Sequence, residues 1–245
     1  MKPRTRPQEY LFPQLTRSGD QTVPIVRRIF LLSPANIREI RGSRILSDGM
    51  QSGMTVRLRN QGVPPGEIFS FISGLYFRGK LAYAEKFAEV AGDAQAAYVI
   101  TASAGLIPSE TLVTLERLRE ISAGEVDPAN EEYRGPLDRD SAALCELVGT
   151  DCQVVLLGSI ATPKYVQPLL ESFGQQLFFP AEFVGRGDMS RGGLMLRCVS
   201  AGVQLTYVPL ARAARHGSRP PKLARRPLKA CQSLSPVGLP NSPSG

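Results

Sequence analysis

The stretch "CQVVLLGSIATPKYVQPLLESFGQQLFFP", residues 152–180, decides the fold class of this chain. It opens with the β-branched, apolar run "CQVVLLGS" (152–159), which is typical of a buried strand. The segment "PKYVQPLLESFG" (163–174) follows with a helical pattern and ends on a glycine, although Pro168 must lie near its first turn or kink it. The segment "QQLFFP" (175–180) then predicts a second strand.

The same alternation of strand and helix patterns continues on both sides of this stretch. Apolar runs predict three further strands, at 27–33, 98–101 and 203–210. Amphipathic spacing and capping residues predict four further helices, at 74–91, 109–121, 139–149 and 188–202. Segment 34–66 is compatible with one or two helices around a glycine-rich break. Buried strands that alternate with helices favour an α/β fold, a single domain with a central, mostly parallel sheet flanked by helices.

Capping residues and apolar spacing refine these helices. Ser109 and Asp188 are expected as N-caps, because their short side chains accept hydrogen bonds from first-turn N–H groups. Gly149 is expected at the C′ position that ends the helix at 139–149. Tyr76 and Tyr83 fall on the apolar stripe of 74–91, so we expect them in the core rather than as stacking platforms.

The basic charge of the chain is concentrated at its two ends. The 245 residues carry a formal net charge of +7, yet the segment 211–245 alone holds seven basic residues and no acid. We expect an irregular arm at 1–26, a folded domain at 27–210 and a basic, disordered tail at 211–245. The tail could bind nucleic acid through nonspecific charge, or it could remain solvated.

The composition disfavours several classes of protein. No apolar run reaches the roughly 18 residues of a membrane-spanning helix. The N-terminal segment lacks the apolar stretch of a secretory signal, so we expect a cytoplasmic protein without a membrane partner. The four cysteines form no C-x-x-C pair and the chain has one histidine, so we expect reduced cysteines and no metal site.

The stretch "FVGRGDMSRGGLML", residues 183–196, predicts a glycine-rich turn that runs into a helix. Gly185 and Gly187 permit a tight turn, and Arg186 and Arg191 flank the expected helix start. A helix N-terminus beside arginine side chains is a favourable site for an anion such as phosphate. The alternative is a turn that only docks the helix on the sheet. At a helix start, the Arg-Gly-Asp tripeptide is not interpreted as a cell-adhesion signal.

Polar loops at the ends of the predicted strands form a second candidate region. Ligands of open parallel sheets bind beyond the carboxyl ends of the strands, where loops 33–36, 101–105 and 158–162 begin. These loops are rich in small and hydroxyl-bearing residues, which let backbone N–H groups approach a ligand. Arg78 and Lys80 lie in the first turns of a helix, against its dipole, and face either an anionic partner or solvent.

These features predict a pocket at the carboxyl ends of the strands for a nucleotide, a nucleobase or another phosphate-bearing ligand. The arginines and the lysine would hold anionic groups, and Asp188 would bond a hydroxyl or a base. The expected ligand-binding residues are Ser33, Asn36, Arg78, Lys80, Ser103, Gly158, Arg186, Asp188, Ser190 and Arg191.

The reaction and any cofactor are not identified by the sequence. An enzyme of nucleotide or nucleic-acid metabolism fits such a pocket, but there is no Ser-His-Asp set, P-loop motif or G-x-G-x-x-G motif opening a helix. Two alternatives stay open. One is a non-enzymatic DNA-binding protein of the oxidative-stress response that uses the basic tail, and the other is an interaction module without a ligand.

The order of several motifs resembles an uncharacterised bacterial α/β family. The motifs are "SPA" after the first strand, "GLYFRGKLAYAEKFA", "YVITASAGLIPSE", "VVLLG" followed by "YVQPLLESF", and "FVGRGDMSRGGLMLR". That family is similar to the peroxide-stress proteins of the YaaA type, through Ser33-Pro34-Ala35 and Met189-Ser190-Arg191. The resemblance spans about residues 27–210 and implies an association with DNA binding and oxidative stress.

Overall fold

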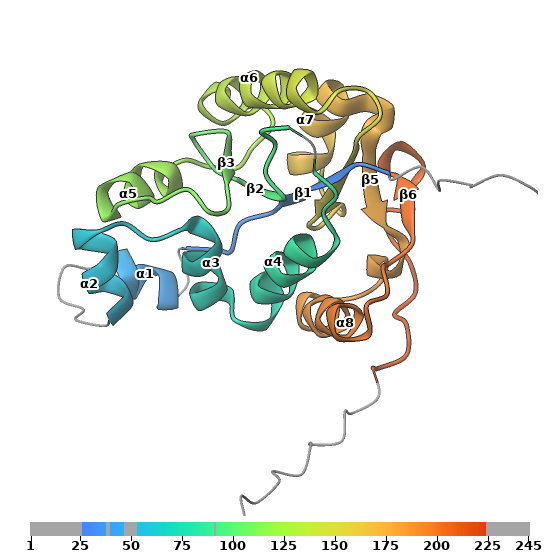
Figure 1. Cartoon of the computed structure of the whole chain (residues 1–245), viewed down its shortest axis with the longest axis horizontal. Coiled ribbons are helices and arrows are strands. Elements are labelled where there is room, and N and C mark those ends of the chain that lie inside the picture. The colour runs from blue at the N-terminus through green and yellow to red at the C-terminus, as the bar shows by residue number, and fades with distance from the viewer. Residues whose placement is uncertain (1–25, 38–39, 47–52, 91, 224–245) are drawn as a thin grey trace, which may run out of the picture.

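The computed structural model of the chain describes residues 26–37, 40–46, 53–90 and 92–223 (Figure 1). The irregular arm expected at 1–26 lies outside the described residues except for Val26. The disordered tail expected at 211–245 lies outside them beyond residue 223.

A six-stranded sheet forms the centre of the molecule, in the order β3-β2-β1-β4-β5-β6. Its strands are β1 (Arg28–Leu32), β2 (Ala97–Ile100), β3 (Leu106–Pro108), β4 (Gln153–Leu157), β5 (Leu177–Pro180) and β6 (Tyr207–Pro209). The four central strands run parallel, whereas β3 and β6 pair antiparallel at the two edges. The prediction of an α/β domain with a mostly parallel sheet is therefore confirmed.

The two central strands, β1 and β4, are nearly all apolar because both of their faces are covered. Every residue of β1 is buried, as are all residues of β4 after Gln153. Side chains alternate between the two faces of a sheet, so helices on both faces require uninterrupted apolar runs such as "IFLL" and "VVLL". Arg28 is the polar exception in β1, and its guanidinium donates hydrogen bonds to the side chain of Gln153.

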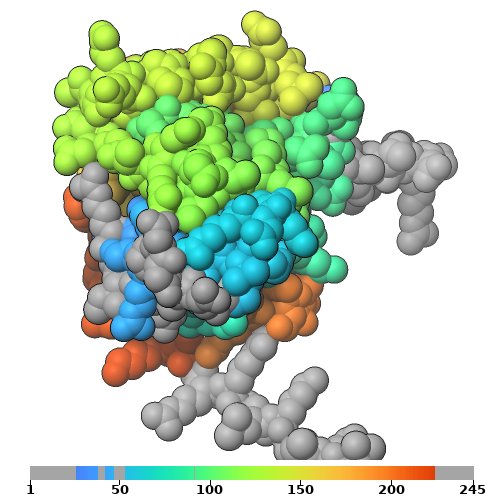
Figure 2. Space-filling model, turned by 90° about the vertical axis from the view of Figure 1, so that its left-hand side faces the viewer, coloured from blue at the N-terminus to red at the C-terminus, as the bar shows by residue number. Residues whose placement is uncertain are grey.

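Helices cover both faces of the sheet. One face carries α6 (Glu131–Val148) and α7 (Pro163–Phe173), and the other carries α3 (Pro65–Ser73), α4 (Leu75–Phe87) and α8 (Asp188–Ala201) (Figure 1). The remaining three helices, α1 (Ile40–Leu46), α2 (Gly53–Asn60) and α5 (Leu115–Ala123), lie at the end of the sheet toward which β1 runs. Figure 2 views the molecule from this end, where α2 and α5 lie side by side.

Helices α4 and α8 cross with their backbones in direct contact. A Cβ atom at Gly79 would lie 2.8 Å from the carbonyl oxygen of Gly192, and one at Gly192 would lie 2.7 Å from the carbonyl oxygen of Leu75. Only glycine fits at such a distance, so the helix propensity lost at Gly192 is explained by packing. The crossing also brings Lys80, which follows Gly79 on α4, close to Arg191, which precedes Gly192 on α8. The charge of Arg191 accordingly lowers the pKa of Lys80.

Several expected element ends differ from the observed ones. Strand β3 was not expected, and only Tyr207–Pro209 of the strand expected at 203–210 forms β6. Helix α6 begins at Glu131 rather than 139, with the Asn130 side chain as its N-cap. Pro136 lies inside this helix. Because proline normally breaks a helix, the sequence did not predict the turns of α6 before residue 139.

The N-caps expected at Ser109 and Asp188 are wrong. Thr114 caps α5 by accepting a hydrogen bond from the Arg117 N–H, while the Ser109 N–H bonds to the Ala97 carbonyl beside the sheet. At α8 the extended residue Gly187 takes the N-cap position without a side-chain hydrogen bond, so Asp188 is the first helical residue. The expected C-terminal glycine of α6 is confirmed, with φ of 71° at Gly149.

Candidate functional site

The loops after β1, β2 and β4 meet at one end of the sheet, because these strands are parallel neighbours. The chain passes from β1 to β2 on one side and from β4 to β5 on the other, so the order of connection reverses between β1 and β4. Open α/β sheets bind ligands at such a reversal, in the crevice between the two outgoing loops. Ser33 and Gly158 stand at this place, each directly after its strand.

A buried lysine lies against the end of β1. The Nζ atom of Lys80, on α4, lies 2.7 Å from the Ser33 carbonyl oxygen and 2.7 Å from the Ser33 Oγ atom. Its side chain is only 1% exposed, and its Nζ lies 4.1 Å from the centroid of the Tyr76 ring. Burial lowers the pKa of Lys80 to about 7, with Asp188 raising it and Arg191 lowering it further. The amine is therefore partly neutral near pH 7 and can accept a proton.

A buried arginine lies against the end of β4. The Nε and Nη2 atoms of Arg191 donate to the Phe183 carbonyl at 3.2 and 3.1 Å, and Nη1 lies 3.4 Å from the Gly158 carbonyl oxygen. The carboxylate of Asp188 approaches the same guanidinium at 3.8 Å but is largely exposed. Arg191 thus links the first turns of α8 to the end of β4, and it places a buried positive charge beside Gly158.

A tyrosine lies beside these two groups, and its hydroxyl makes no hydrogen bond of normal geometry. Tyr76, on α4, is 7% exposed; its Oη atom is buried, and the Arg191 guanidinium is the side chain that approaches it. Burial raises the pKa of Tyr76 to about 12, the nearby Arg191 lowers it and Asp188 raises it. Tyr165, on α7, also lies near Tyr76. Burial raises the pKa of Tyr165, and a negative charge on Tyr76 would raise it further. A buried hydroxyl without a partner costs about 1–3 kcal/mol, so it calls for a functional explanation.

A cavity of about 540 Å³ opens beside this cluster. Its walls come from the loop after β1, the end of β2, the C-terminal end of α5 and the start of α7, and Phe69 of α3 closes one side. The polar and charged residues in its lining are Asn36, Thr101, Ser122, Glu125, Asp127, Lys164 and Tyr165. Tyr165 belongs to the cavity wall and lies near Tyr76, so it separates the cavity from the buried cluster by a single side chain.

Six of the ten predicted ligand-binding residues belong to the cavity lining or to the cluster at the ends of β1 and β4. They are Ser33, Asn36, Lys80, Gly158, Asp188 and Arg191. Of these six only Asn36 lines the cavity, and the side chains of Lys80 and Arg191 are turned toward the strand-end carbonyls.

The other four predicted residues have different surroundings. Arg78 is exposed on α4, two residues before the buried Lys80. The Ser103 hydroxyl donates to the Glu120 carbonyl at 2.8 Å, outside the cavity lining. Arg186, in the turn before α8, donates to the hydroxyl of Ser190, in the first turn of α8, at 3.2 Å, so these two side chains pair with each other.

Sequence reasoning missed four residues of the site. Tyr76 was assigned to the core, which is correct for its burial but not for its unpaired hydroxyl. Tyr165, Asp127 and Thr101 line the cavity and were not singled out. Thr101 belongs to loop 101–105, which the sequence places beyond a strand end, but Ser103 rather than Thr101 was chosen from that loop.

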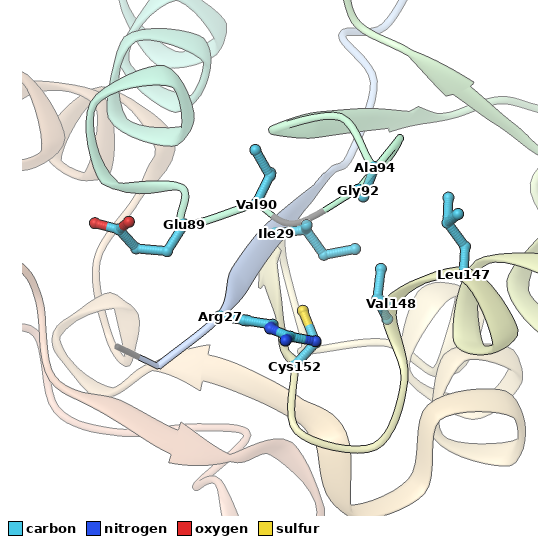
Figure 3. Close-up of a pocket in the computed structure, with 9 residues that line it drawn as sticks. All are labelled: Arg27, Ile29, Glu89, Val90, Gly92, Ala94, Leu147, Val148 and Cys152. Carbon is cyan, nitrogen blue, oxygen red and sulfur yellow. The ribbon is translucent and has the colours of Figure 1, made fainter. Parts of the chain in front are cut away.

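A smaller cavity, of about 310 Å³, lies at the opposite end of the sheet (Figure 3). The apolar side chains of Ile29, Val90 and Val148 line it, and Arg27 lies beside the thiol of Cys152. Burial raises the pKa of that thiol, and the nearby Arg27 and Arg28 lower it less than burial raises it. A protonated thiol is a weak nucleophile, so this cavity offers less chemistry than the crevice.

Two further cysteines, Cys145 and Cys198, lie within the described residues. Burial raises the pKa of both thiols, and both are free, as Cys152 is. The part of the chain that the structure describes holds no group of three or more metal-ligating side chains. Among the same residues, no helix is long and apolar enough to span a membrane.

Comparison with known proteins gives no further assignment, because no protein-family model, curated protein or solved structure matches the chain.

Proposed function

We propose that the chain binds a nucleotide, or a related phosphate-bearing compound with a nucleobase, at the carboxyl end of the sheet. The observation that carries this proposal is the buried hydroxyl of Tyr76, which makes no hydrogen bond of normal geometry, beside Arg191 and the start of α8. A phosphate oxygen placed there would accept the missing hydrogen bond of the tyrosine.

The electrostatics around Tyr76 favour an anion. Helix α8 has 14 residues and no side chain caps its N-terminus, so its first-turn N–H groups present a partial positive charge. Arg191 adds a full charge within this turn, and Lys80 adds a fractional one. The exposed carboxylate of Asp188 would bond a hydroxyl or a base amino group rather than the phosphate.

The 540 Å³ cavity suits the nucleoside part of such a ligand. Its volume lies within the range of roughly 300–1,000 Å³ that small-molecule pockets occupy. Glu125 and Asp127 outweigh Lys164 in its lining, so it favours the hydrogen-bond donors of a base or a sugar over a second phosphate. The ligand would therefore point its phosphate toward α8 and its base toward Asn36 and Asp127. An enzyme of nucleotide or nucleic-acid metabolism would be the natural setting for such a site.

A thermal-unfolding experiment tests this proposal. We expect at least one compound among the nucleoside monophosphates, nucleosides, nucleobases and inorganic phosphate to stabilise the full chain. Ligand at 100 times its Kd adds about 2.7 kcal/mol, which raises the midpoint by several degrees for a chain of this size. Tyr76→Phe should abolish most of this rise, because it removes the hydroxyl while keeping the ring.

The matched control is Tyr98→Phe. It removes a phenol hydroxyl that accepts from the Gln95 N–H on another part of the sheet, so it should leave the ligand response unchanged. An equal response in Tyr76→Phe would place the ligand elsewhere. If no compound stabilises the folded chain, the binding proposal fails and an interaction module without a ligand becomes the better explanation.

A second candidate function is DNA binding through the basic tail, in line with the resemblance to peroxide-stress proteins. The observation that favours it is the exposure of the tail's described basic residues, Arg212, Arg215, Arg219 and Lys222. Replacing these four with glutamine should weaken duplex-DNA binding and flatten its dependence on salt, by about 0.9 in logarithmic slope for each phosphate that is no longer neutralised. An unchanged slope in filter-binding assays at several salt concentrations would contradict this function.

A further inference from the structure

The hydroxyl of Ser33 and the amine of Lys80 are hydrogen-bonded to each other. The proposed ligand binding does not require this contact. The Lys80 Nζ atom lies 2.7 Å from both oxygens of Ser33, the carbonyl O and the hydroxyl Oγ. A neutral amine has two N–H groups and one lone pair. In the structure Nζ donates to both oxygens, and the Ser33 hydroxyl donates a long bond, 3.5 Å, to the Leu157 carbonyl. A neutral amine could keep its bond to the carbonyl and turn its lone pair toward the hydroxyl, whose proton would then leave the Leu157 carbonyl.

The groups around Lys80 keep it in the form that can accept a proton. Tyr76 faces it from its own helix, and Asp188 and Arg191 influence it from α8, while β1 contributes Ser33. No carboxylate of the described residues forms an ion pair with its Nζ atom. Burial therefore dominates and lowers the pKa of Lys80 to about 7. Buried lysines with this property serve as general bases at neutral pH.

Ser33 lies closer to the cavity than Lys80 does. Both residues are buried, with 6% of Ser33 and 1% of Lys80 exposed. Ser33 is not in the lining of the 540 Å³ cavity, but the two residues after it, Pro34 and Ala35, are. A compound that extends past Pro34 and Ala35 would meet the serine before the lysine, which is the order that a nucleophile and its base require.

We propose that Ser33 is a nucleophile with Lys80 as its general base, and that the chain cleaves an acyl compound such as a carboxylic ester held in the adjoining cavity. A serine–lysine pair is a recognised variant of the acyl-transfer nucleophile and base. This inference goes beyond the proposed binding function, and it does not require the natural ligand to be a nucleotide.

The proposed reaction proceeds in two balanced steps. Lys80 Nζ takes the Ser33 hydroxyl proton while Oγ forms a bond to the acyl carbon, and the bond to the leaving group then breaks as that group takes the proton from Lys80. Water next attacks the acyl-serine, giving its proton to Lys80. The ester bond to Oγ breaks, the carboxylic acid leaves, and Oγ recovers its proton from Lys80.

Arg191 lies where it can stabilise the charge of the intermediate. Its Nη1 atom donates to the Gly158 carbonyl, and a Cβ atom at Gly158 would lie 3.1 Å from Ser33 Oγ. Gly158 therefore lies next to both side chains, and we take the guanidinium as the group that would bind an acyl oxygen on Ser33. A fixed positive charge at such a place stabilises the oxyanion of the tetrahedral intermediate.

The test is covalent labelling of the full chain with a fluorophosphonate, followed by peptide mass spectrometry. Serine displaces fluoride from this probe only when its hydroxyl is activated. We expect label on Ser33, with a rate that rises about tenfold per pH unit below pH 7 and levels off above it. Ser109 is 4% exposed and has no amine partner, so it serves as the internal control and should stay unlabelled.

Variants and a substrate complete the test. Ser33→Ala should lose the label and should reduce hydrolysis of p-nitrophenyl acetate by at least tenfold, and Lys80→Met should slow the labelling of Ser33 by a similar factor. Should Lys80→Met not fold, the pH profile of the wild-type chain still reports the base. Absence of label on Ser33, labelling no faster than at Ser109, or a rate that does not change between pH 6 and pH 8 would each overturn the proposal.

Discussion

Replacing Gly192 with alanine is expected to destabilise the chain by about 3 kcal/mol, although alanine is the better helix former. The added Cβ atom would lie 2.7 Å from the Leu75 carbonyl oxygen and 2.8 Å from the Tyr76 Cα atom. Both are backbone atoms of α4, which cannot rotate away as the end of a side chain can. The helices must separate, and the packing between α4 and α8 weakens. Urea unfolding monitored by circular dichroism measures the difference.

The next residue of the same helix provides the control. A Cβ atom at Gly193 would meet only the Leu223 Cδ1 atom, at 3.5 Å, which is an ordinary contact. Gly193→Ala should therefore be neutral or stabilise the chain by about 0.5–1 kcal/mol through its helix propensity. Equal effects of the two substitutions would show that the close crossing of α4 and α8 does not exist.

The second large effect is the pH dependence of stability at Lys80. The unfolded lysine titrates near pH 10.5 and the folded one near pH 7, so between these values the unfolded chain binds more protons. Stability must then rise with pH in this window, because the penalty for burying a charged amine disappears. Relative to that of Lys80→Met, the free energy of unfolding of the wild type should rise by about 2 kcal/mol between pH 7 and pH 9.

Urea unfolding of both proteins at several pH values measures this gain, and the comparison removes the contribution of all other titrating groups. Lys86→Met is the matched control, since Lys86 lies on the same helix but is exposed. A constant difference between wild type and Lys80→Met would mean that the buried amine keeps its ordinary pKa.

The fold could be predicted because strands that are buried on both faces of a sheet have a recognisable, continuously apolar sequence. Strands such as β1 and β4 need apolar residues at every position after the first, so their runs differ from the spaced apolar residues of amphipathic helices. Strand β3 has three residues, "LIP", and owes its existence to pairing with β2 rather than to a local preference. Likewise, the start of α6 was concealed because tertiary packing outweighs the helix-breaking tendency of Pro136.

The site could be predicted only in part, because side-chain direction depends on the phase of each helix. Arg78 and Lys80 are two residues apart, so they point to nearly opposite sides of α4, and only one can face the sheet. Lys80 lies four residues after Tyr76 and three before Tyr83, on the apolar stripe itself, and this spacing could have identified it as buried. The unpaired hydroxyl of Tyr76 could not be foreseen, since hydrogen-bond satisfaction depends on residues distant in sequence.

Both edges of the sheet end in short strands that contain proline. Pro108 lies in β3 and Pro209 in β6, and each strand has only three residues. Proline has no N–H group to donate, so neither edge offers the continuous row of donors that an incoming strand would need. Folded copies of this chain are therefore poor templates for one another. Fibrillar aggregation would have to start from partly unfolded molecules. The short edge strands with proline therefore favour a folded chain that stays unaggregated at high concentration.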